Sequence, residues 1–191
     1  QMVTKGHDFP GVTLVGILRA DMGLQVFDFR AAERTFQLLT QVAGRAGRGE
    51  EPGRVLLQTF LPEHYAIAAA AAQDYAAFVR AELPARRELG YPPFGALALL
   101  RGEGPEEPRV VEAMERLAEV LRPAADASGV ELLGPAPAPL PRLRGAYRRH
   151  LLLKGPTRRA VREVAERAAV WAERAPRGVR VILDIDPLHL V

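Results

Sequence analysis

The stretch HLLLKGPTRRAVREVAERAAVWAERAPRGVRVILDID, residues 150–186, predicts a strand, a helix and a second strand in close succession. Residues 150–155 and 179–186 are apolar runs of strand length, and residues 157–174 carry apolar side chains at helical spacing. The segment before it has the same order, with apolar runs at 96–102 and 130–134 flanking a helix expected at 108–121. Together these elements predict a split βαβ sandwich, in which an antiparallel sheet carries both helices on one face.

The first part of the chain has a different pattern. VTLVGIL at 12–18 is a continuous apolar run, which predicts a strand covered on both faces. A helix expected at 31–46 and the run RVLLQTF at 54–60 complete a strand–helix–strand unit of a parallel sheet. Two strands do not make a stable sheet of this kind, so we expect residues 1–62 to end a larger α/β domain.

Between these halves, the alanine-rich residues 62–90 predict a long helix that Pro84 interrupts. GYPPFG at 90–95 ends the helical segment, because its glycine can cap a helix and its prolines require an extended path. We therefore expect a helical connector at 63–94 and a separate domain at 95–191.

Composition excludes several classes of protein. The 191 residues contain no cysteine, which excludes disulfides and cysteine-ligated zinc within this chain, and the four histidines have no metal-ligand spacing. No run of about 18 apolar residues and no signal peptide are present, which favours a cytoplasmic protein without membrane association. The net charge of +3 is weak evidence for an anionic partner. Evidence for such a partner must therefore come from local clusters of basic residues.

One such cluster is QVAGRAGRG at 41–49. If the helix continued, Gln41, Arg45 and Arg48 would project from the same side of it, next to glycines that carry no side chain. Such a surface could stabilise charge on a transferred phosphoryl group. The alternative is that the arginines favour the negative end of the helix dipole, with Gly47 or Gly49 as the cap.

Two further basic clusters lie in the second half. PRLRGAYRRH at 141–150 is expected to connect the middle strands, and its arginines and tyrosine are suited to DNA phosphates and an unpaired base: Arg142, Arg144, Tyr147, Arg148 and Arg149. Thr157, Arg158, Arg159 and Arg162 open the last helix, where cations oppose the dipole and so suggest a partner. Solvated surface charge is the alternative for both clusters.

TKGHDFP at 4–10, followed by a buried strand, a helix and QVAGRAGR, resembles motifs V and VI of superfamily 2 helicases. More narrowly, four blocks in order resemble the PriA family of primosomal replication-restart helicases: TKGHDFPGVTLVGIL, DFRAAERTFQLLTQVAGRAGRG, RRELGYPPF and LGPAPAPLPRLRGAYRRHLLLKGPTRR. This resemblance implies an ATP-dependent 3′–5′ DNA helicase that recognises stalled forks and promotes reloading of the replicative helicase. Residues 1–62 would then end the second RecA-like lobe, and residues 95–191 would form a ribosomal S10-like C-terminal domain.

The resemblance also implies roles for single residues. Gln41, Arg45 and Arg48 would face ATP bound to the other lobe, with Gly44 beside the nucleotide. Gly6 and Asp8 would link nucleotide and DNA, and Thr4 would lie near the DNA backbone; a turn or helix cap is the alternative for Asp8. Arg158, and less directly Arg162, would bind the acidic tail of single-stranded DNA-binding protein. Arg19 departs from the acidic residue that relatives carry in the corresponding LDAD.

The sequence has no Gly-Lys-Ser/Thr loop and no Asp-Glu-x-His segment. ATP and Mg²⁺ in the intact protein are therefore expected to depend on residues upstream of this chain, as is the family's zinc. We expect the isolated chain to bind DNA and single-stranded DNA-binding protein without hydrolysing ATP. The expected partners of the whole protein are forked and single-stranded DNA, single-stranded DNA-binding protein, other primosome proteins and the replicative helicase. The alternative is a non-enzymatic nucleic-acid-binding or scaffold protein.

Overall fold

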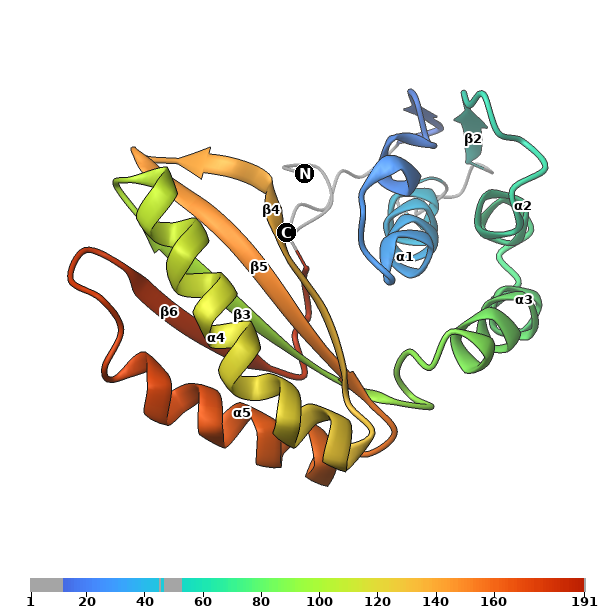
Figure 1. The fold of residues 1–191 in the computed structure, drawn as a ribbon. Coiled ribbons are helices and arrows are strands. Elements are labelled where there is room, and N and C mark those ends of the chain that lie inside the picture. Colours follow the sequence, from blue (N-terminus) through green and yellow to red (C-terminus); the bar gives the residue numbers. More distant parts are fainter. Residues whose placement is uncertain (1–11, 45, 47–52, 191) are drawn as a thin grey trace. The chain divides into compact units, whose positions relative to one another are not determined.

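A computed structural model describes residues 12–44, 46 and 53–190 of the chain (Figure 1). The chain divides into two compact units, Gln1–Ala85 and Arg86–Val191. Five of the predicted site residues lie outside the described residues: Thr4, Gly6, Asp8, Arg45 and Arg48.

The first unit contains a two-stranded parallel sheet. Strands β1 (Leu14–Ile17) and β2 (Arg54–Leu57) pair with Val15 opposite Val55, and helix α1 (Ala31–Ala43) lies between them in sequence. The predicted parallel strand–helix–strand unit is confirmed. The prediction that β1 is covered on both faces is wrong for the part of the chain described here, because its burial alternates and Leu14 is 57% exposed.

A small apolar core holds the helices of the first unit together. It is formed by α1, α2 (Tyr65–Ala71) and α3 (Tyr75–Glu88), and a short 3₁₀ helix, η2 (Met22–Gln25), packs beside α1. Phe36 of α1 stacks on Phe78 of α3 with 4.6 Å between ring centroids. Stacked aromatic pairs at this separation add to the stability that burial provides.

The alanine-rich segment forms two helices instead of one helix interrupted at Pro84. The chain turns at Gln73, whose φ is +53°, and the carboxylate of Asp74 then accepts a hydrogen bond from the backbone N–H of Ala77 at 2.8 Å. This side-chain cap starts α3, which continues past Pro84 to Glu88. The predicted position of the break was wrong because a local aspartate cap outweighed the proline signal.

The second unit has the predicted split βαβ architecture. Its elements are β3 (Ala96–Gly104), α4 (Glu107–Ser128), β4 (Glu131–Leu143), β5 (Ala146–Gly155), α5 (Arg158–Ala172) and β6 (Arg180–Ile185). The sheet order is β4-β5-β3-β6 with antiparallel pairing throughout. Helices α4 and α5 pack against each other on one face of this sheet (Figure 1). The mixed α/β fold class is therefore confirmed.

The core of the second unit lies between this sheet and its two helices. Strands β3 and β5 supply alternate residues, such as Leu100 and Leu151, and α4 and α5 supply apolar stripes that include Leu117 and Val164. All four side chains are fully buried. Gly129, with φ +64°, ends α4 in the left-handed conformation that favours glycine.

Strands β4 and β5 extend well beyond the predicted 130–134 and 150–155. The prolines at 135, 137, 139 and 141 lie within β4, which is an edge strand of the sheet. Alternate residues direct their N–H groups to the same side of a strand, so prolines at every second position remove donors along one side only. The basic run PRLRGAYRRH is consequently the end of the β4–β5 hairpin; it connects the middle strands as predicted, but most of it belongs to the strands themselves.

Candidate nucleic-acid interface

The tip of the β4–β5 hairpin presents an arginine-rich surface. Leu143 pairs with Ala146, and the two residues between them, Arg144 and Gly145, have φ of +49° and +85°. Two successive residues with positive φ are typical of the type I′ turn that suits the twist of a hairpin. Arg142 and Arg144 are exposed, so the turn projects two cations into solvent.

Tyr147 lies beside these arginines. It is opposite Arg142 in the strand register, and the Arg142 guanidinium lies 5.0 Å from the centroid of its ring. The arrangement combines cations with a half-buried aromatic ring, the groups that bind the phosphates and bases of a single strand.

The remaining two arginines of the run lie on opposite faces of the sheet. Arg149 is opposite Gly102 in the strand register. A side chain at Gly102 would point at Met114 of α4, so Arg149 lies on the face of the sheet that carries the helices. Arg148 belongs to the helix-free face and is only 7% exposed. Because successive side chains of a strand point to opposite faces, the predicted set of four arginines around Tyr147 is not a single patch.

The helix-free face carries a charged cluster on β3, β5 and β6. Arg101 is opposite His150, and Glu103 is opposite both Arg148 and Arg180. Glu103 forms an ion pair of 2.7 Å with Arg180 and one of 3.6 Å with Arg101. Within the part of the chain that the structure describes, three buried nitrogens of this cluster have no hydrogen-bond partner: Nε of Arg101, Nε of Arg148 and Nε2 of His150.

His150 has an unusual protonation equilibrium. Burial, followed by the positive charges of Arg148 and Arg101, lowers the pKa of His150 to about 4. The imidazole is therefore neutral at physiological pH and can donate one N–H without adding a charge. Sequence spacing did not identify His150, because only the pairing of β3 with β5 brings it beside Arg101.

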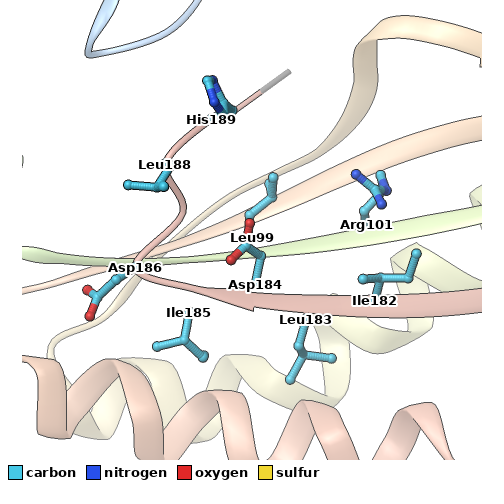
Figure 2. A pocket seen from close by; sticks show the side chains of 9 residues that line it. All are labelled: Leu99, Arg101, Ile182, Leu183, Asp184, Ile185, Asp186, Leu188 and His189. Atoms are coloured by element: carbon cyan, nitrogen blue, oxygen red, sulfur yellow. The ribbon is translucent and has the colours of Figure 1, made fainter.

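A hollow of about 590 Å³ adjoins this cluster. Its lining includes Leu99 and Arg101 of β3, Asp184 of β6 and the segment that follows β6, with Leu188 and His189. Figure 2 shows Arg101 and Asp184 directed toward that segment, whereas Leu183 and Ile185 point toward the helix beneath the sheet.

The cations that open α5 all have partners within the chain. Thr157 caps the helix by accepting a hydrogen bond from the N–H of Ala160 at 3.2 Å. The ion pairs are Arg158 with Asp186 at 3.3 Å, Arg159 with Glu163 at 2.9 Å and Arg162 with Glu166 at 3.0 Å. Arg158 is nevertheless 83% exposed, and an exposed pair of this kind contributes only about 0–1 kcal/mol, so a partner could displace it.

Only part of the predicted nucleotide-facing set lies in the described region. Helix α1 ends at Ala43 and not at the predicted residue 46. Arg45 and Arg48 lie outside the described residues, so their placement on a common surface stays a prediction. Gly44 is the C-cap, and its N–H donates to the carbonyl of Thr40 at 3.0 Å. A Cβ at Gly44 would meet no described atom closer than 3.6 Å, so packing within these residues does not require glycine there. Gln41 lies exposed on the last turn of α1.

The loop after β1 is organised by Asp21, a residue that the sequence did not single out. Its buried carboxylate accepts hydrogen bonds from the Thr59 hydroxyl at 3.0 Å and from the N–H of Phe60 at 3.1 Å. The hydrogen bond from Phe60 is the largest cause of the lowered pKa of Asp21. Arg19, two residues earlier, is exposed with φ +50°.

Comparison with known proteins identifies the family. Residues 87–188, more than half of the chain, match the model of the primosomal protein N C-terminal domain. The chain belongs to this family. Replication restart protein PriA of Synechocystis is 46% identical over 193 residues, and that of Haemophilus influenzae is 38% identical over 190 residues; both alignments cover 100% of this chain. PriA of Bacillus subtilis is 46% identical over 154 residues, covering 81% of the chain.

The chain spans 22% of the Synechocystis relative, 19% of the Bacillus subtilis relative and 26% of the Haemophilus influenzae relative. All three relatives are named replication restart protein PriA. Among the described residues, no cluster of acidic, histidine or cysteine side chains has the arrangement of a metal site, and no helix has the length and apolar character to cross a membrane.

We predict that His150 makes the second unit sensitive to acid. Its pKa is about 4 in the fold and about 6.5 when unfolded, so the unfolded chain binds more protons between these values and stability falls as pH decreases through this window. Between pH 7.5 and pH 4.5, the wild-type chain should lose about 1–2 kcal/mol more stability than His150→Gln, allowing for screening by solvent.

Denaturant unfolding followed by the fluorescence of Trp171 measures this difference, because this single tryptophan packs against the core of the second unit. Arg122→Gln, at an exposed position of α4, is the control and should keep the wild-type pH dependence. The same pH dependence in wild type and His150→Gln would contradict the prediction.

Proposed function

We propose that this chain is the C-terminal portion of an ATP-dependent 3′–5′ DNA helicase that recognises stalled replication forks and promotes reloading of the replicative helicase. The observation that carries the proposal is membership of the primosomal protein N C-terminal domain family, with relatives named replication restart protein PriA. The hairpin tip supports a DNA contact, because it presents exposed guanidinium groups next to an aromatic ring. Forked and single-stranded DNA are the proposed nucleic-acid partners.

For the hairpin tip, we predict that DNA affinity and stability respond in opposite directions to Arg144→Asn. Arginine is disfavoured at φ +49°, whereas asparagine accepts this conformation, so the variant should be more stable by about 0.5–1 kcal/mol. It also removes a cation, and with Arg142→Gln added, affinity for single-stranded DNA should fall about ten-fold and depend less steeply on salt.

Fluorescence anisotropy with a labelled oligonucleotide at two salt concentrations measures this effect. Arg116→Gln is the matched control, because Arg116 is an exposed arginine of α4 paired with Glu112 at 2.6 Å. If the double variant and the control bound equally well, the hairpin tip would not be the DNA contact.

Residues of this chain and residues upstream of it would together bind the nucleotide. In this proposal the end of α1 and the residues after it contribute Gln41, Gly44, Arg45 and Arg48, with the arginines at the γ-phosphate. The residues for ATP, Mg²⁺ and zinc would lie upstream, and a bound nucleotide would supply the energy for strand separation.

In the whole protein, we expect Arg48→Ala to reduce DNA-stimulated ATP turnover at least about 10²-fold while leaving DNA affinity nearly unchanged, because it removes a charge that stabilises the transferred phosphoryl group. A phosphate-release assay measures turnover, with Arg54→Ala as a control at an exposed β2 position. Normal turnover in Arg48→Ala would reject the role at the γ-phosphate.

The start of α5 is the proposed contact for the acidic tail of single-stranded DNA-binding protein, with Arg158 as the main residue and Arg162 one turn later. A guanidinium can bind a terminal carboxylate through two hydrogen bonds, and the weak pair with Asp186 leaves Arg158 available for exchange. Other primosome proteins and the replicative helicase are further proposed partners of the whole protein.

We predict that Arg158→Ala weakens binding of an acidic tail peptide ten-fold or more, since a charge-assisted hydrogen bond is worth about 1.5–3 kcal/mol. Arg159→Ala is the matched control, because it removes a neighbouring exposed arginine that pairs with Glu163. Anisotropy with a labelled peptide measures both variants, and equal losses would indicate a diffuse basic surface instead of a defined site.

A further inference from the structure

We propose that Arg148, His150 and Arg101 on the helix-free face of the sheet form a site for a backbone phosphate of single-stranded DNA. The inference rests on the proposed DNA-binding function and assigns it a second contact, separate from the exposed hairpin tip. Among the described residues, this is a cluster of buried cationic and imidazole nitrogens without hydrogen-bond partners.

The first argument is that Arg148 is buried and its Nε lacks a hydrogen-bond acceptor. It is 93% buried, since its exposed fraction is 7%, yet its Nε has no hydrogen-bond partner among the described residues. A buried N–H of a charged group without an acceptor is unfavourable unless something offsets its desolvation. An anion bound at this place would satisfy it, whereas the opposite residue, Glu103, is already engaged with Arg180 and Arg101.

The second argument is the convergence of three donors. The register places Arg101 opposite His150, and Arg148 lies two residues before His150 on the same face of β5. His150 remains neutral near Arg101 and Arg148, so it can donate a hydrogen bond to a phosphate without the cost of charging the imidazole. Two guanidinium groups and one imidazole suit a singly charged phosphodiester with two unesterified oxygens.

The charges around the site favour an anion near β5. Register places five other charged residues on the helix-free face: Glu103, Arg180 and Asp184 nearer the cluster, and Glu131 and Lys154 at the other end of the sheet. Lys154 and Glu131 form a pair at 3.1 Å, and Glu103 is shared by two arginines. Arg148 therefore provides positive charge that no ion pair among the described residues balances, while Asp184 lies on β6, separated from β5 by β3.

The third argument is that a hollow adjoins the site and that the site lies close to the hairpin tip. Arg101 also lines the hollow beneath the segment after β6, so this face is open beside the cluster (Figure 2). Arg148 is the third residue of β5, about 7 Å along the strand from Ala146, which follows the turn at Arg144 and Gly145. At that separation, one DNA strand could contact both the hairpin tip and this site. This continuity favours DNA over an acidic peptide.

The test uses the full 191-residue chain and an oligothymidylate. NMR titration of the His150 ring, with and without the oligonucleotide, should show a rise in the pKa of His150 on binding, because a bound phosphate offsets the charges of Arg148 and Arg101. The pKa of His64, at the start of α2 in the first unit, is the internal comparison. An unchanged His150 pKa in a chain that binds the oligonucleotide would overturn this inference alone.

A substitution provides the second measurement. Arg148→Met should weaken oligonucleotide binding about ten-fold or more without lowering the unfolding temperature, because an apolar side chain replaces an unpaired buried charge. Arg122→Met, at an exposed position of α4, should change binding less than two-fold. Unchanged DNA affinity in Arg148→Met, with a lower unfolding temperature, would assign Arg148 a structural role and overturn the inference.

Two outcomes separate this inference from the proposed function. If the wild-type chain fails to bind the oligonucleotide, both the proposed DNA contact and this site are rejected. If an acidic peptide raises the pKa of His150 and the oligonucleotide does not, the face binds a protein, and the phosphate site is rejected while DNA binding at the hairpin tip stands.

Discussion

The antiparallel pairing of β3 with β5 is the constraint on which the second unit depends. Its register places Leu100 opposite Leu151 and Arg101 opposite His150, so that apolar and charged residues alternate between the two faces. The apolar face joins α4 and α5 in one core, and the charged residues gather on the other face. A shift of one residue would turn the arginines toward the helices and the leucines toward solvent, which makes the register strongly specified.

The basic regions of this unit differ in their environment more than in their composition. Arg158 at the start of α5 is exposed and paired with Asp186, whereas Arg142 at the hairpin tip is exposed and lies against Tyr147. Arg148 is buried without a hydrogen-bond partner among the described residues. Exposed pairs exchange readily with a ligand, while a buried unpaired charge carries a cost that a ligand can remove. The three regions are therefore suited to different partners.

In the first unit, a buried aspartate connects the segments that follow the two parallel strands. The buried carboxylate of Asp21 connects the loop after β1 to the segment after β2 through Thr59 and Phe60. Several large apolar side chains remain exposed there, including Phe27 at 89% and Phe60 at 78%. An apolar surface of this kind favours contact with further protein. This agrees with a chain that spans only a fifth to a quarter of its relatives.

The sequence alone determined the order of elements, the split βαβ architecture and the parallel strand–helix–strand unit, because hydrophobic periodicity is a local property. The start of the last helix at Thr157 and the helix at 108–121 were likewise predicted from it. Only the tertiary structure decided the length of β4, the separation of Arg148 from Arg149, the pairing of Arg158 with Asp186 and the meeting of Arg101 with His150. These features depend on which strands are neighbours and on which side chains are thereby removed from water, and residues distant in sequence settle both.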